Sequence, residues 1–150
     1  MNTPTDYLVH ISTGQEGFKT YIRTGSHQLI VDEPASVGGT NEGPTPYGLL
    51  LASLGACTAM TLRMYADRKK WPLETVEVAL NHSQDYHQDC MACAESNAKI
   101  DVIQRVIQLH GNLDEAQIKR LMDIADKCPV HKTLTSTTVI KTRLANEDGA

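Results

Sequence analysis

Four cysteines are the residues of this sequence with the clearest capacity for chemistry. Cys57 lies within a long apolar stretch, and Cys128 begins the segment CPVH. A proline directly after Cys128 suits the first position of a short helix, whose free backbone N–H groups lower the pKa of a nearby thiol. Cys128 is therefore a candidate reactive thiol. For Cys57, composition alone favours a small buried core residue, because free cysteine is among the most buried residue types.

The other two cysteines belong to a second cluster, with the pattern His82-x4-His87-x2-Cys90-x2-Cys93. Two thiols and two imidazoles are the right number and type of ligands for tetrahedral zinc. The usual zinc finger has its histidines after the cysteines and farther away, so the match is loose. A redox pair of the C-x-x-C type and a polar loop with inert cysteines are the two other interpretations. We expect the protein to use no metal and no cofactor.

A long helix is expected to carry Cys57. Thr45 is a suitable N-cap and Pro46 suits the first helical position, while the prediction ends the helix at Trp71 and Pro72. The helix is apolar nearly all round, and small residues fill positions 52–61. Such a helix must be covered on most sides, and we expect a second subunit to supply part of that cover.

Around this helix, the hydrophobic periodicity predicts strands and one more helix. The strands are expected at 17–24, 28–33, 73–82, 99–110 and 137–144, and an amphipathic helix at 114–127. Glu115, Asp123 and Asp126 are expected on the solvated face of that helix. The order β-β-α-β-β-α-β predicts an α+β fold with an antiparallel sheet, as a single domain over 1–150.

The composition excludes several functional classes. The formal net charge is −4 over 150 residues and the isoelectric point is near 5.8, which argues against nucleic-acid binding. The longest uncharged run, 43–62, is close to membrane-spanning length, but Gly, Ser, Thr and two prolines interrupt it, so we predict a core helix and no membrane association. The N-terminal residues do not resemble a secretory signal, and we expect a cytoplasmic protein. Nucleotide-binding and serine-hydrolase motifs are absent from the sequence.

Two segments together carry a family resemblance. The sequence GPTPYGLLLASLGACTAM, followed some seventy residues later by ADKCPVHKTL, closely resembles the OsmC/Ohr family of osmotically induced and organic-hydroperoxide-resistance proteins. The surrounding GGTNEGPTP and TLRMYADRKKWPLE are similar to the branch often fused behind an α/β-hydrolase domain. The resemblance covers about 25–144.

The resemblance implies a fold and a reaction. It implies an intertwined homodimer whose long central helices pack together, with active sites at the subunit interface. It also implies a thiol-dependent peroxidase, in which the Cys57 thiolate attacks an organic hydroperoxide and becomes a sulfenic acid. Cys128 would then form a disulfide with Cys57, and an external dithiol would reduce it.

The sequence departs from the family pattern at one position. In peroxidase members a Glu directly follows the proline and pairs with an Arg that stabilises the thiolate, whereas here Tyr47 and Gly48 follow it. Arg23 is the best candidate for the cation, although a solvated strand residue is the simpler interpretation. Glu33 and Glu42 could replace the missing carboxylate. Three alternatives therefore stay open: a weaker peroxidase or one with another substrate, a non-catalytic module that binds a small apolar or thiol-reactive ligand between subunits, and a zinc protein built on the second cluster.

Overall fold

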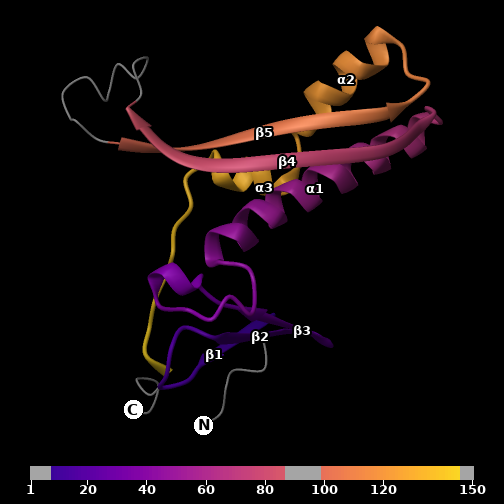
Figure 1. The fold of residues 1–150 in the computed structure, drawn as a ribbon. Helices are drawn as coiled ribbons and strands as arrows, with labels where there is room; N and C mark the ends of the chain where they lie inside the picture. Colours follow the sequence, from indigo (N-terminus) through magenta and orange to yellow (C-terminus); the bar gives the residue numbers. More distant parts are fainter. Residues whose placement is uncertain (1–7, 87–98, 146–150) are drawn as a thin grey trace. The chain divides into compact units, whose positions relative to one another are not determined.

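The computed structural model describes residues 8–86 and 99–145, which separate into two compact units. The first unit contains the chain up to Leu49 and the segment from Thr138 onward, and the second unit contains Leu50–Thr137. Figure 1 shows the secondary structure of both. The prediction of a single domain over 1–150 stays a prediction. The α+β class with antiparallel strands and one long helix is confirmed.

The first unit is built on a three-stranded antiparallel sheet. Ile22 on the central strand faces Ile11 on one side and Leu29 on the other, so an apolar row crosses the sheet. Gly25 provides the left-handed backbone (φ 58°) that the tight turn between the second and third strands requires. The strands are β1 (Val9–Thr13), β2 (Thr20–Thr24) and β3 (His27–Val31), in the order β1-β2-β3.

A loop after β3 is organised by one buried carboxylate. Asp32 is 1% exposed and accepts hydrogen bonds from the hydroxyl of Thr40 at 2.6 Å and from three backbone N–H groups. The hydroxyl of Thr40 and these backbone donors outweigh desolvation and lower the pKa of Asp32 to about 2. The same loop contains a short 3₁₀ helix, Ala35–Val37.

The second unit places helices on a long β-hairpin. The fully buried Leu62 of the long helix and Leu121 of the amphipathic helix belong to one apolar core. Gly55 lets the helix approach the hairpin closely, since a Cβ there would lie 2.7 Å from Leu80 Cδ1. The elements are α1 (Pro46–Lys69), β4 (Leu73–Tyr86), β5 (Lys99–Gly111), α2 (Glu115–Ala125) and α3 (Pro129–Leu134). In Figure 1 the β4–β5 hairpin runs alongside α1.

The predicted helix boundaries agree with the structure. α1 begins at Pro46, and Thr45 Oγ1 accepts the backbone N–H of Gly48 at 3.0 Å. Asp114 caps α2 through a reciprocal capping box with Gln117. α1 is long and apolar enough to span a membrane by length and composition, but Leu62 is fully buried inside the second unit, as in a core helix.

Three strand predictions need correction. β1 was not predicted as a separate strand, although the first 33 residues as a whole were predicted to be β structure; its alternating residues Val9–Thr13 pair with β2. β4 extends beyond the predicted end at His82, since polar residues up to Tyr86 still pair with β5. The strand predicted at 137–144 is wrong: within the described residues this segment pairs with no strand, and Ile140 is 86% exposed. An alternating pattern indicates a strand only where a neighbouring strand accepts its hydrogen bonds.

Candidate active site

The structure brings Cys57 and Cys128 together. Cys57 lies on α1 and Cys128 is the N-cap of α3, and in the second unit the Cys57 side chain is close enough to lower the pKa of the Cys128 thiol. Both are free thiols. Cys57 is half-buried, whereas Cys128 is completely buried. The two cysteines that the sequence singled out are therefore neighbours in space. In the sequence, Cys128 lies 70 positions after Thr58, the residue that follows Cys57.

Cys128 is surrounded by hydrogen-bond donors. Its Sγ atom accepts the backbone N–H of His131 at 3.3 Å and lies 3.9 Å from Thr58 Oγ1. Burial by itself raises the pKa of the Cys128 thiol. Hydrogen bonds from the backbones of His131 and Val130 and from the side chains of Cys57 and Thr58 outweigh burial, so the pKa lies below its ordinary value.

An arginine that the sequence interpretation did not single out reaches this cluster from β5. Arg105 is 11% exposed, and its Nη1 donates to Thr58 Oγ1 at 2.9 Å and to the carbonyl of Ala125 at 3.4 Å. Its Nη2 donates to Asp126 Oδ1 at 2.8 Å. Asp126, predicted only as a solvated residue of the amphipathic helix, is thus also the ion-pair partner of Arg105, and its Oδ1 lies 3.8 Å from His131 Nδ1.

The alternation of β5 could have identified Arg105. Ile103, Ile107 and Leu109 turn their side chains to the covered face of the strand, while Val106 is 68% exposed. Arg105 lies on the covered face, where a charged side chain needs a partner. The sequence signal that could have identified Arg105 was therefore a charged residue at a position of the strand where the alternation places apolar residues.

A cavity of about 450 Å³ lies beside this cluster, within the second unit. Apolar side chains form much of its wall, and Arg105, Asp126 and His131 supply polar groups. Its lining residues are Leu54, Asp101, Ile103, Arg105, Ile107, Met122, Asp126, His131, Leu134 and Thr135. Such a mixture of apolar wall and few convergent polar groups is typical of small-molecule sites.

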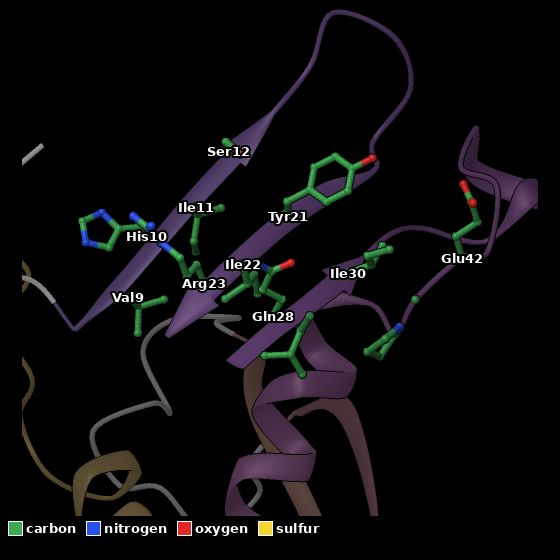
Figure 2. A pocket seen from close by; sticks show the side chains of 13 residues that line it. Val9, His10, Ile11, Ser12, Tyr21, Ile22, Arg23, Gln28, Ile30 and Glu42 are labelled. Carbon is green, nitrogen blue, oxygen red and sulfur yellow. The ribbon is translucent and has the colours of Figure 1, made fainter. Parts of the chain in front are cut away.

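Arg23 belongs to the first unit. It lies on β2 in register with His10 of β1, and both line a cavity of about 1050 Å³ that also includes Tyr21 and Glu42, as Figure 2 shows. Glu42 forms an ion pair with Lys19 at 2.8 Å. Arg23 stays a candidate for the cation that stabilises the Cys57 thiolate.

The second cysteine cluster is only partly within the described residues. His82 Nε2 lies 2.8 Å from Asp101 Oδ1 across the β4–β5 hairpin. His87, Cys90 and Cys93 lie outside the described residues. Among residues 8–86 and 99–145, no group of three side chains could hold a metal ion. The zinc and redox-pair interpretations of this cluster stay predictions.

Comparisons with known proteins identify one family. The model of the OsmC-like protein family matches residues 39–143. An osmotic stress induced and detoxification response protein from Psychrobacter arcticus has the same fold, with a TM-score of 0.67 and 18% identity over 88% of this chain and 90% of that chain. An organic hydroperoxide resistance protein OsmC from Legionella pneumophila has a TM-score of 0.61 and 19% identity, over 87% of this chain and 91% of that chain. An organic hydroperoxide resistance protein from Elizabethkingia anophelis has a TM-score of 0.61 and 17% identity, over 89% of this chain and 91% of that chain. No curated protein sequence matches.

Proposed function

Because this chain belongs to the OsmC-like protein family, we propose that it is a thiol-dependent peroxidase that reduces organic hydroperoxides with Cys57 and Cys128. The observation that carries the proposal is the proximity of the two thiols, since Cys57 on α1 is one of the groups that lower the pKa of Cys128 at the start of α3. Solved structures of similar fold include proteins named for organic hydroperoxide resistance, which agrees with this substrate class.

The exposure of the two thiols supports the roles proposed for them. Cys57 is half-buried and can be reached by a substrate, whereas Cys128 is completely buried behind Thr58 and Cys57. The Cys57 thiolate attacks the outer oxygen of the hydroperoxide, the O–O bond breaks, and the alkoxide leaves as the alcohol after taking a proton. Cys57 is then a sulfenic acid. The Cys128 thiolate attacks its sulfur, hydroxide leaves and takes a proton from solvent to become water, and a Cys57–Cys128 disulfide remains.

An external dithiol completes the cycle in this proposal. It supplies two electrons and two protons by thiol–disulfide exchange and is itself oxidised to a disulfide. Arg23 is proposed as the cation that stabilises the Cys57 thiolate before the peroxide arrives. Neither step requires a metal or another cofactor.

We also propose that the protein acts as a homodimer in the cytoplasm. A single chain leaves large apolar side chains exposed on both units, among them Met60 and Met64 of α1 and Val139 and Ile140 of the C-terminal segment. Apolar surface of this extent usually marks an interface. Light scattering coupled to gel filtration measures the mass directly, and a monomer at micromolar concentration would contradict the dimer.

The peroxidase proposal is tested by mapping the oxidised cysteines. Reduced protein is treated with one equivalent of cumene hydroperoxide, blocked with an alkylating agent, digested and analysed by mass spectrometry. We expect a stoichiometric Cys57–Cys128 disulfide within the mixing time of a rapid-quench experiment. If both thiols stay reduced, the peroxidase proposal fails, and a Cys90–Cys93 disulfide would instead move the chemistry to the second cluster.

Single substitutions separate the two thiols. Cys57→Ser is expected to abolish peroxide consumption. Cys128→Ser is expected to consume one equivalent to form the Cys57 sulfenic acid and, in excess peroxide, a second equivalent to form the overoxidised sulfinic acid. A Cys90→Ser/Cys93→Ser variant is the matched control and should keep the activity. Equal peroxide consumption by the Cys57→Ser variant and the wild type would favour the non-catalytic ligand-binding module.

A further inference from the structure

We propose that Arg105 is a positioning residue that acts through the Thr58 hydroxyl to hold the Cys128 sulfur as a thiolate opposite Cys57, and that it thereby sets the rate of disulfide formation. This inference rests on the proposed peroxidase function and deepens it. It concerns the second step of the cycle, in which Cys128 attacks the Cys57 sulfenic acid.

The first argument is the position of the guanidinium group. Arg105 is 11% exposed and is held on two sides, by Asp126 at 2.8 Å and by the carbonyl of Ala125 at 3.4 Å. Its Nη1 donates to the hydroxyl of Thr58 at 2.9 Å, and Thr58 is completely buried. These two hydrogen bonds fix the orientation of the guanidinium plane, so that Nη1 also donates to Thr58.

The second argument is the single proton of the Thr58 hydroxyl. Thr58 Oγ1 accepts a hydrogen bond from Arg105, so its own proton has two acceptors within reach: the carbonyl of Leu54 at 2.7 Å and Cys128 Sγ at 3.9 Å. The carbonyl is the better acceptor while Cys128 is a neutral thiol. When Cys128 becomes a thiolate, rotation about the Cβ–Oγ1 bond of Thr58 turns this proton toward the negative sulfur while the oxygen keeps its bond from Arg105. A cation behind the hydroxyl oxygen polarises the O–H bond and strengthens that hydrogen bond.

The charges on every side of Cys128 agree with this role. Arg105 comes from β5, His131 from α3 and Cys57 from α1, while Asp126 at the end of α2 is the one carboxylate that the structure places in this network. Asp126 lies against Arg105 and is 68% exposed, so solvent and the guanidinium both screen its effect on the sulfur. The network therefore favours the anionic form of Cys128.

The expected effect follows from two opposing terms. Loss of a nearby cation raises a thiol pKa by about one unit, which lowers the thiolate fraction about tenfold at a pH below that pKa. The remaining thiolate is about threefold more nucleophilic, because nucleophilicity rises with pKa at a slope of about 0.4–0.5. We therefore expect disulfide formation to slow about threefold at neutral pH in Arg105→Met, with a rate profile displaced to higher pH by about one unit.

The direct test is a titration of Cys128 that involves no peroxide. In a Cys57→Ser/Cys90→Ser/Cys93→Ser background, Cys128 is the only thiol, and its ionisation is followed by the ultraviolet absorbance of the thiolate. Arg105→Met should raise the midpoint by about one unit, and Arg105→Lys by less, because it restores the charge without the fork. Arg120→Met is the matched control: Arg120 donates to the hydroxyl of Tyr65 on the same unit, away from the thiols, and should leave the midpoint unchanged.

Thr58→Val tests the relay by a second route. It keeps the side-chain shape, leaves the guanidinium in place and removes the hydroxyl, so it should raise the midpoint of the Cys128 titration as Arg105→Met does. If Arg105→Met does not fold, Thr58→Val still tests the inference. A midpoint in Arg105→Met or Thr58→Val equal to that in Arg120→Met overturns the inference. This outcome is distinct from failure of the peroxidase proposal, which shows as absence of a disulfide in wild-type protein treated with peroxide. A shifted midpoint with an unchanged rate of disulfide formation would also overturn the claim about rate.

Discussion

Thr58→Val also makes a prediction about stability that can be worked out from the contacts. Valine has the shape of threonine, so the substitution creates no cavity at this fully buried position. It removes the acceptor of the 2.9 Å hydrogen bond from Arg105 and leaves Nη1 with the 3.4 Å contact to the carbonyl of Ala125. Hydrogen bonds to charged groups contribute about 1.5–3 kcal/mol. Since Arg105 keeps its bond to Asp126 and borders a cavity, we expect the lower end, about 1.5–2 kcal/mol.

A double-mutant cycle measures this interaction apart from other effects. The free energy of unfolding is obtained from urea denaturation under reducing conditions at one protein concentration, because association changes the apparent stability. Thr58→Val and Arg105→Met should be non-additive, with a coupling energy of about 1 kcal/mol or more. Thr58→Val and Arg120→Met share no partner and should add within about 0.5 kcal/mol. Additivity between Thr58→Val and Arg105→Met would refute the assignment of this hydrogen bond.

Three further predictions concern the stability of the two units. Leu121→Ala should lower the free energy of unfolding in urea by about 2–5 kcal/mol, because Leu121 is fully buried in the core, whereas Ile118→Ala at a 41% exposed position on the same helix should cost much less. The pKa of Asp32 is lowered from 3.8 to about 2, so ionised Asp32 stabilises the folded state fully above pH 3.8 and loses this effect as the pH falls toward about 2. Asp32→Asn should remove this part of the pH dependence of the free energy of unfolding. An acid-unfolding transition equal to that of the wild type would contradict this prediction. Gly111→Ala should destabilise strongly, since φ is 133° and a Cβ would lie 2.0 Å from a backbone carbonyl oxygen, while Gly14→Ala meets no atom within 4 Å and should leave the melting temperature nearly unchanged.

Local signals in the sequence were sufficient to predict the helices. Thr45 with Pro46, and Asp114 with the periodic apolar residues after it, determine where α1 and α2 begin through short-range hydrogen bonds. Strands depend on a partner that the local sequence does not name. The segment 137–144 alternates as a strand does but pairs with none among the described residues, whereas β1 forms because β2 lies beside it.

The candidate site shows the same division. Cys57 and Cys128 were identified by their sequence contexts, but their contact depends on how α3 packs in the second unit. Arg105 was overlooked because one charged residue in an alternating strand resembles a solvent-facing position. Only the register with Ile103 and Ile107 shows that it lies on the covered face, where Thr58 and Asp126 become its partners.

The hydrogen bond from the His131 backbone to Cys128 Sγ joins the proposed redox reaction to the folding of one helical turn. α3 has six residues, too few to be stable by itself, so its start depends on the cap that Cys128 provides. A thiolate accepts this N–H far better than a disulfide sulfur does, so oxidation of the proposed pair would loosen α3, and a firmer α3 would favour the reduced pair. The two equilibria form one thermodynamic cycle. A cap of about 1 kcal/mol corresponds to about 20 mV in a two-electron couple, which makes the disulfide a correspondingly stronger oxidant. Under the proposed cycle, substitutions on α3 away from either sulfur therefore tune how readily an external dithiol reduces the disulfide.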